Sequence, residues 1–120
     1  MANIQDVTDS ILSSIKKSLG IPVEVKDFDV PIIVEINAAF FVLTQLGVGP
    51  KKGFMISSEE DTYDEFVSDP IEQALIKQYL VDKTKISFDP PSSATLMESL
   101  KKHIDEAEFR LQVAWDQKKK

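Results

Sequence analysis

Few side chains in this chain of 120 residues could support catalysis or bind a ligand. His103 is the single histidine, and it lies among Lys101, Lys102 and Asp105 on the polar side of a predicted helix. Cysteine is absent, which excludes thiolate chemistry and cysteine-ligated zinc. Because no nucleophile, base and orienting group can be named together, we predict a protein without enzymatic activity. We interpret His103 as a solvated helix residue rather than as a general base or metal ligand.

Two segments superficially look like ligand sites. Residues 59–65 carry five carboxylates that could attract a divalent cation, but they lack the alternate oxygen ligands and the central glycine of a calcium loop. Residues 47–53, with the sequence GVGPKKG, follow a helix instead of a strand, and Pro50 lacks an N–H donor that a phosphate loop needs. We therefore interpret the first segment as a solvated acidic loop and the second as a helix stop and turn, and we predict no metal and no cofactor. The five carboxylates are Glu59, Glu60, Asp61, Asp64 and Glu65.

Four helices are predicted from the spacing of apolar residues and from end signals, at about residues 6–19, 30–46, 70–88 and 94–117. Together they predict a single all-α domain over residues 1–120, resembling a small four-helix bundle. The residues that delimit the helices are Asp6 and Gly20 for the first, Asp29 for the second, Asp69 followed by Pro70 for the third, and Ser92 or Ser93 for the fourth.

The second and third helices carry more apolar surface than one small domain can cover. Apolar residues surround the second helix on all sides, which makes a neighbouring subunit a candidate for part of its cover. The third helix has two apolar faces, and Asp82 falls within the main one. Either Asp82 pairs with Lys85 or with a basic group across a contact, or the helix is rotated from this placement.

The fourth helix combines a packing seam with a small apolar patch. The seam recurs at intervals of three and four residues, as in helical bundles. Phe109 and Val113 lie one turn apart on the opposite, mostly charged face, and we predict that they form a contact, with scattered surface residues as the alternative. The seam consists of Met97, Leu100, Ile104, Ala107, Leu111 and Ala114.

A long connection without a helical pattern runs over residues 48–69. Compact domains rarely contain such a connection unless it binds something, so its apolar side chains predict a surface that a partner covers. Residues 53–57 are compatible with a short strand, paired either in a hairpin with residues 62–66 or with another subunit. The predicted interface residues of this connection are Phe54, Met55, Ile56, Tyr63 and Phe66.

Charge and composition limit the partners. The net charge is −6, and without the terminal Lys118, Lys119 and Lys120 the chain has 11 basic and 20 acidic residues, a net charge of −9. Such a body repels a phosphate backbone, which argues against direct nucleic-acid binding. We interpret the lysine tail as a solvated end, with a basic contact arm as the alternative. The first ten residues contain no Lys or Arg, and no run is apolar enough to span a bilayer, so we expect neither a secretory signal nor a membrane partner.

The order of motifs along the chain resembles that of the head-tail connector, or adaptor, proteins of long-tailed bacteriophages and prophages. No single motif is a catalytic signature, and the resemblance rests on their combination over almost the whole chain. The motifs are SILSSIKKSLGI at residues 10–21, IN at 36–37, LTQLGVGP at 43–50, GF at 53–54, YDEF at 63–66, FDPPS at 88–92 and EFRL at 108–111.

This resemblance implies a structural subunit that forms a homo-oligomeric ring, typically of about twelve copies, beneath the portal of the DNA-filled head. The ring extends the DNA channel, lets DNA pass without specific binding, and docks the stopper or tail-completion protein. It also implies a place in the virion at the head-tail junction, after assembly in the cytoplasm of the bacterial host. Residues 51–68 and the segment beyond Trp115 are the parts that would contact other subunits or the portal.

Our leading hypothesis is therefore a ring-forming connector that acts by shape and interface burial. The alternative is a small helical regulatory or adaptor module that binds one protein partner as a monomer or dimer. It would use the same Phe109 and Val113 patch but would need no ring.

Overall fold

The structure of the protein is a computed structural model that describes residues 10–119. Its helices, in chain order, are α2 (Ile11–Ser18), α3 (Asp29–Gln45), α4 (Tyr63–Phe66), α5 (Pro70–Phe88) and α6 (Ala94–Lys118). Within these described residues there is no named strand, and the β-type pairing consists of one isolated antiparallel bridge between Ser10 and Thr62. The prediction of an all-α fold is confirmed.

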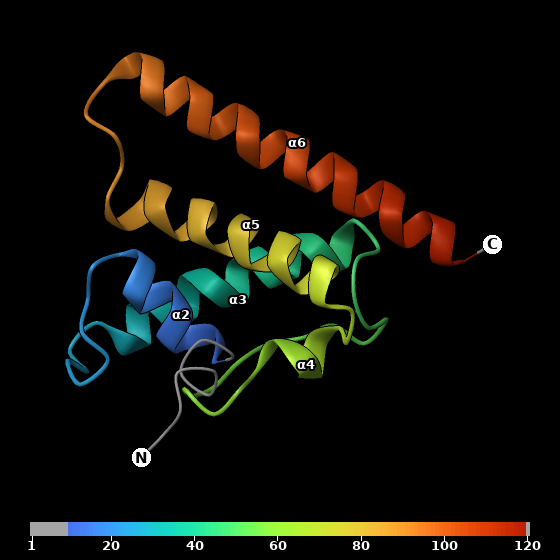
Figure 1. Cartoon of the computed structure of the whole chain (residues 1–120), viewed down its shortest axis with the longest axis horizontal. Coiled ribbons are helices and arrows are strands. Elements are labelled where there is room, and N and C mark those ends of the chain that lie inside the picture. The colour runs from blue at the N-terminus through green and yellow to red at the C-terminus, as the bar shows by residue number, and fades with distance from the viewer. Residues whose placement is uncertain (1–9, 120) are drawn as a thin grey trace.

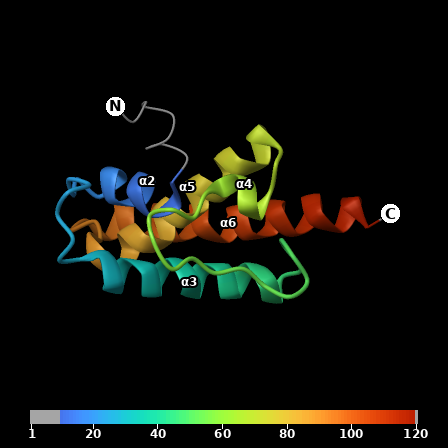
Figure 2. The ribbon, with the colours of Figure 1, turned by 90° about the horizontal axis from the view of Figure 1, so that it is seen from below.

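Helix α5 is the centre of the arrangement, since α2, α3, α4 and α6 all pack against it. Helix α6 lies along one side of α5, and α3 lies behind α5 (Figure 1). In the perpendicular view α3 forms one border of the molecule (Figure 2). The body is flat, with extents of 43 × 39 × 22 Å. A layer this thin leaves the outer faces of α3 and α6 without cover from the rest of residues 10–119.

The predicted end signals of the later helices are confirmed. Asp69 Oδ1 accepts hydrogen bonds from the N–H groups of Ile71 at 2.8 Å and Glu72 at 3.3 Å, so it caps α5. Ser93 caps α6 in the same way. At the end of α3, Gly47 has a φ of 81°, a left-handed conformation that glycine adopts without steric cost.

One predicted helix start is wrong, and another falls outside the described residues. Among residues 10–119 the first helix is α2, which begins at Ile11, because Ser10 is extended and its hydroxyl caps the helix. The predicted start at Asp6 lies outside the described residues. Asp29 is the first residue of α3 and not its cap, because its carboxylate lies 2.7 Å from the ammonium group of Lys16.

Lys16 fixes the connection between α2 and α3. Its side chain is only 1% exposed, and its Nζ donates to the carbonyl oxygens of Val23 at 2.9 Å and Val25 at 2.6 Å. The two carbonyl oxygens accept hydrogen bonds from the ammonium group, and the Asp29 carboxylate supplies the opposite charge that a buried cation requires. A segment without regular structure is thereby held against α2.

The long connection after α3 is part of the core. Phe54 and Phe66 pack with Phe40 of α3, with ring centroids 4.9 to 5.3 Å apart, and Phe66 also lies 6.1 Å from the ring of Trp115. Two of these pairs are edge-to-face, the arrangement that aromatic quadrupoles favour. A Cβ on Gly49 would lie 2.6 Å from the Phe66 ring, so only glycine allows the chain to pass there.

The connection does not form the hairpin that the sequence allowed. Asn37 of α3 donates from Nδ2 to the carbonyl oxygen of Ile56 at 2.9 Å and accepts from the Ile56 N–H at 2.8 Å. This side-chain amide supplies the two hydrogen bonds that a neighbouring strand would have made. The proposed mate around residues 62–66 is the single-turn helix α4 instead.

Candidate assembly surfaces

The structure gives most of the apolar loop residues a role inside the subunit. Ile56, Tyr63 and Phe66 are at most 8% exposed, and Phe54 is partly buried against the core. The expectation that these side chains remain uncovered in the subunit is therefore wrong, because α3, α4 and the end of α6 already enclose them. Met55 differs, since 70% of its surface is exposed.

An apolar stripe runs along the outer face of α3. Val30, Val34 and Phe41 are 72%, 60% and 63% exposed. Their spacing of four and seven residues places them on one side of the helix, opposite the buried residues that face α5. We did not select these residues as interface residues from the sequence, although an α3 that is apolar all round was the signal that contained them.

The stripe continues into a groove of about 440 Å³ between the end of α3 and the long connection. Phe41 and Met55 lie in its walls, and Lys52 stands at its border with an exposed side chain. The full lining is Asn37, Phe41, Thr44, Lys52, Gly53, Phe54 and Met55. This end of α3 therefore presents an apolar surface beside a positive charge.

Helix α6 shows the two faces that the sequence predicted. Leu100, Ile104 and Leu111 of the predicted seam are buried against the rest of the chain. Phe109 and Val113 are 63% and 39% exposed on the opposite side. Their exposure is confirmed, and their contact with a partner stays a prediction.

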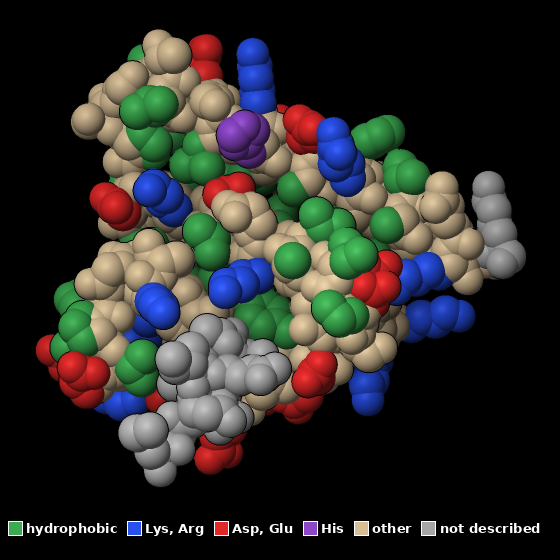
Figure 3. All heavy atoms as spheres, in the orientation of Figure 1, with side chains coloured by type: hydrophobic (Ala, Val, Ile, Leu, Met, Phe, Trp, Pro, Cys, Tyr) green, Lys and Arg blue, Asp and Glu red, His purple; other side chains and the backbone are tan. Residues whose placement is uncertain are grey.

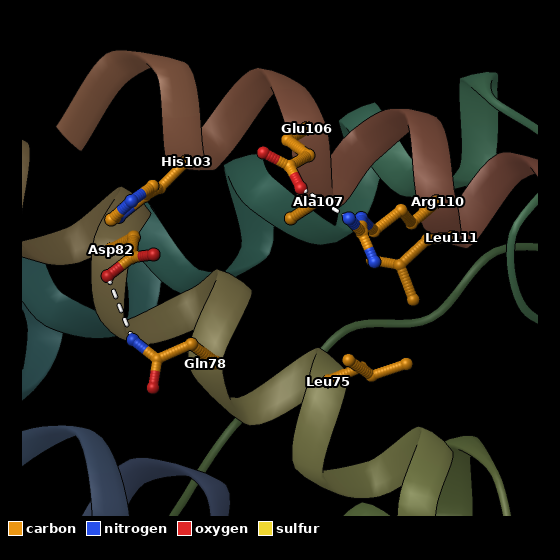
Figure 4. Close-up of a pocket in the computed structure, with 8 residues that line it drawn as sticks. All are labelled: Leu75, Gln78, Asp82, His103, Glu106, Ala107, Arg110 and Leu111. Carbon is orange, nitrogen blue, oxygen red and sulfur yellow. Dashed lines mark hydrogen bonds and ion pairs between the residues drawn. The ribbon is translucent and has the colours of Figure 1, made fainter. Parts of the chain in front are cut away.

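A hollow of about 490 Å³ lies on the surface between α5 and α6 and is lined by residues of both helices (Figure 4). Asp82 of α5 is 9% exposed, and its Oδ1 accepts a hydrogen bond from Gln78 Nε2 at 3.0 Å. His103 of α6 lies across the hollow from Asp82 (Figure 4). The full lining is Leu75, Gln78, Asp82, His103, Glu106, Ala107, Arg110 and Leu111. The hollow thus combines apolar walls with a buried carboxylate.

The family of the chain follows from its match to a family model. The model described as "Phage connector protein" matches residues 11–118, from the first residue of α2 to the last residue of α6. The chain belongs to the phage connector protein family. No curated protein and no solved structure matches it. The resemblance seen in the sequence is confirmed, and as members of a structural, non-catalytic family such connectors are components of the virion.

The C-terminal end of the connector is held against its body. Lys118 Nζ lies 2.6 Å from Glu72 Oε1 and 4.0 Å from the centroid of the Trp115 ring. Lys119 is exposed beside Asp116, and Lys120 lies outside the described residues. Lys118 is therefore part of the ordered end of α6 and not frayed, although its side chain remains 43% exposed to solvent.

The acidic loop of the connector uses its carboxylates for local hydrogen bonds. Asp61 accepts from the N–H groups of Ser57 at 2.7 Å and Ser58 at 3.1 Å. Glu65 accepts from the Thr62 N–H at 2.7 Å, which fixes the start of α4. These contacts explain Asp61 and Glu65 as turn and capping groups.

Two tyrosine hydroxyls join helices of the connector. The Tyr63 and Ser14 hydroxyls lie 2.6 Å apart, and burial raises the pKa of Tyr63 to about 12 although the hydrogen bond with Ser14 lowers it. The Tyr79 hydroxyl donates to Glu108 of α6 at 2.8 Å. Burial, followed by that carboxylate, raises the pKa of Tyr79 well above its ordinary value. Both tyrosines therefore stay protonated at neutral pH.

None of the helices within residues 10–119 has the length and apolar character required to span a membrane.

Proposed function

We propose that this connector forms a closed ring beneath the portal, extends the DNA channel there, and docks the stopper or tail-completion protein. The observation that carries the proposal is the apolar stripe of Val30, Val34 and Phe41 on a member of the phage connector family. Three large apolar side chains that are each at least 60% exposed on one helix face favour burial by another protein.

A ring requires two different contact surfaces on each subunit, because each copy meets one neighbour with one face and the next neighbour with another. The flat body offers such a pair. The α3 stripe lies on the side of α3 that faces away from α5, and the hollow lies between α5 and α6 (Figure 4). Met55 belongs to the α3 surface, since it lines the groove beside Phe41.

The outer edge of α6 is the surface that we assign to the portal or the stopper. Phe109 and Val113 lie on the side of α6 that faces away from α5, so a neighbour on either flat face leaves them accessible. Lys118 and Lys119 follow at the C-terminal end of the same helix. A contact there would join the ring to the next component of the head-tail junction without using the surfaces that close the ring.

The charge of the chain suits a conduit for DNA. The net charge of −6 disfavours adhesion of a phosphate backbone to the ring wall, so DNA would slide past it instead of binding. The proposal therefore needs no DNA-binding site.

Mixing the connector with its purified portal tests this function. We expect averaged electron micrographs to show a ring of connector added to one end of the portal, and the connector and portal to sediment together. A connector that remains a separate small species in the presence of portal would contradict the proposal. A mutant phage that lacks the connector should accumulate DNA-filled heads without tails.

A further inference from the structure

We propose that the hollow around Asp82 receives Lys52 and the adjoining end of α3 from the neighbouring copy of this chain. This inference rests on the ring proposed above, and it assigns the two surfaces that meet. The Asp82 hollow is one surface, and the α3 stripe with Lys52 is the other.

Asp82 has no cationic partner among residues 10–119 of its own subunit. Among residues 10–119, no Lys, Arg or His nitrogen lies within 4.0 Å of its carboxylate. Lys85, the partner in the same helix that the sequence suggested, does not pair with it. Gln78 supplies one neutral hydrogen bond, and Arg110 is engaged by Glu106 at 2.6 Å. A carboxylate that is nine-tenths buried beside a hollow, without a counter-charge, favours a cation that arrives from outside.

The hollow continues an exposed apolar stripe on α5. Ile71 and Leu75 are 74% and 44% exposed, and with Gln78 and Asp82 they recur at intervals of four, three and four residues. This spacing places all four on one side of α5 and is the pattern of a helix that packs along another helix. The α5 surface therefore changes from apolar at its N-terminal end to acidic at Asp82.

The α3 surface has a complementary order of features, since an apolar part is followed by a basic residue. Val30, Val34 and Phe41 follow one side of α3 over eleven residues, which is also the interval from Ile71 to Asp82. Lys52 lies just past Phe41, in the lining of the same groove. Laid along α5, this stripe would cover Ile71 and Leu75 with its apolar part and bring the ammonium group of Lys52 towards Asp82.

The two surfaces lie on different sides of the body, as repeated head-to-tail contacts require. The buried face of α3 packs on α5, so the exposed stripe points away from α5. The residues of the hollow project between α5 and α6 in front of the α3 ribbon (Figure 4). Hydrophobic side chains are also visible on the face of the molecule that carries α5 and α6 (Figure 3). Contact between unlike surfaces repeats from copy to copy until the ring closes.

Charge reversal with rescue tests the pairing. Lys52→Asp and Asp82→Lys are each expected to raise the concentration for half-assembly, measured by mass photometry with portal present, by about tenfold or more. The double variant should return to within about threefold of the wild type, since the pair is restored with its signs exchanged. Lys17→Asp and Glu60→Lys reverse exposed charges elsewhere and should leave assembly unchanged. Circular dichroism of each variant, and the nearly isosteric Asp82→Asn, separate lost assembly from lost folding.

The absence of native cysteines allows a second readout. Val34→Cys together with Leu75→Cys should give a ladder of disulfide-linked oligomers in the assembled wild-type background. Val34→Cys together with Leu96→Cys, an exposed residue near the other end of the α5 and α6 hairpin, should not. Lys52→Asp and Asp82→Lys variants that each assemble normally, or a double charge-reversal variant that stays unassembled, would overturn the pairing while leaving the ring intact. A wild-type chain that forms no ring even with portal would overturn both proposals.

Discussion

The side-chain amide of Asn37 holds the backbone of Ile56 through two hydrogen bonds, of 2.9 Å to its carbonyl oxygen and 2.8 Å from its N–H. Helix α3 thereby takes the place of a neighbouring strand for an extended segment. The Ile56 side chain is 1% exposed next to this clamp. A connection that lacks regular structure is in this way made part of the core.

Replacement of Asn37 by Ala should loosen this connection. The change leaves the Ile56 N–H and carbonyl groups without these partners, which we expect to cost about 2–3 kcal/mol of unfolding free energy. Urea denaturation followed by circular dichroism measures the loss. Gln45→Ala, at an exposed position of the same helix, serves as the control. Equal stability of the two variants would show that the clamp contributes nothing.

The neighbouring Met55 and Ile56 should respond in opposite ways to substitution by serine. Ile56→Ser removes a buried side chain and is expected to cost about 3–4 kcal/mol of stability. Met55→Ser, at a side chain that is 70% exposed, should leave stability within about 0.5 kcal/mol and weaken assembly instead. Thermal unfolding and mass photometry on both variants distinguish the two effects. A destabilised Met55→Ser subunit with normal assembly would contradict the assignment of Met55 to a contact surface.

Lys16 should contribute more to the stability of the fold than a charged side chain usually does. Lys16→Met keeps the apolar stem but leaves Asp29, whose side chain is 20% exposed, and two carbonyl groups without their cation. We expect a loss of about 3 kcal/mol. Lys17→Met, which removes the next and exposed lysine, should be nearly neutral in the same denaturation assay. A neutral Lys16→Met would mean that the apolar replacement compensates fully for the lost pair.

The stability of the subunit should fall at alkaline pH. The pKa of Tyr63 rises from 10 in the unfolded chain to about 12 in the fold, so the folded state holds this proton more tightly. Its contribution is complete below pH 10 and is lost as pH rises through 12, an effect of about 3 kcal/mol. Tyr63→Phe should make the decline in unfolding free energy between pH 9 and about 12 less steep. Part of the decline should remain, because the pKa of Tyr79 is also raised in the fold. An unchanged slope in the variant would show that Tyr63 does not cause the decline.

Local signals in the sequence located the later helices well, because short-range rules determine their ends. Asp69 followed by Pro70, Ser93 and Gly47 each act within one turn of the helix they delimit. The prediction of Asp29 as a cap was wrong, because its carboxylate pairs with Lys16, thirteen residues earlier in the chain. Such long-range pairings leave no local pattern.

The surfaces were harder to predict than the helices. Apolar side chains in the long connection suggested a partner, but packing with Phe40 and Trp115 encloses Phe54 and Phe66 within the subunit. Composition alone does not distinguish a contact from a core in a segment without periodicity. Asp82 was more informative. The sequence places this carboxylate in an apolar helix face, and in the structure it lines the hollow between α5 and α6.

Native mass spectrometry of the connector, alone and with its portal, tests the central claim most directly. The proposed function predicts a closed ring of about twelve copies of the 13.5 kDa chain, roughly 160 kDa, either free or bound to the portal. A subunit that remains strictly monomeric even with portal present would contradict it.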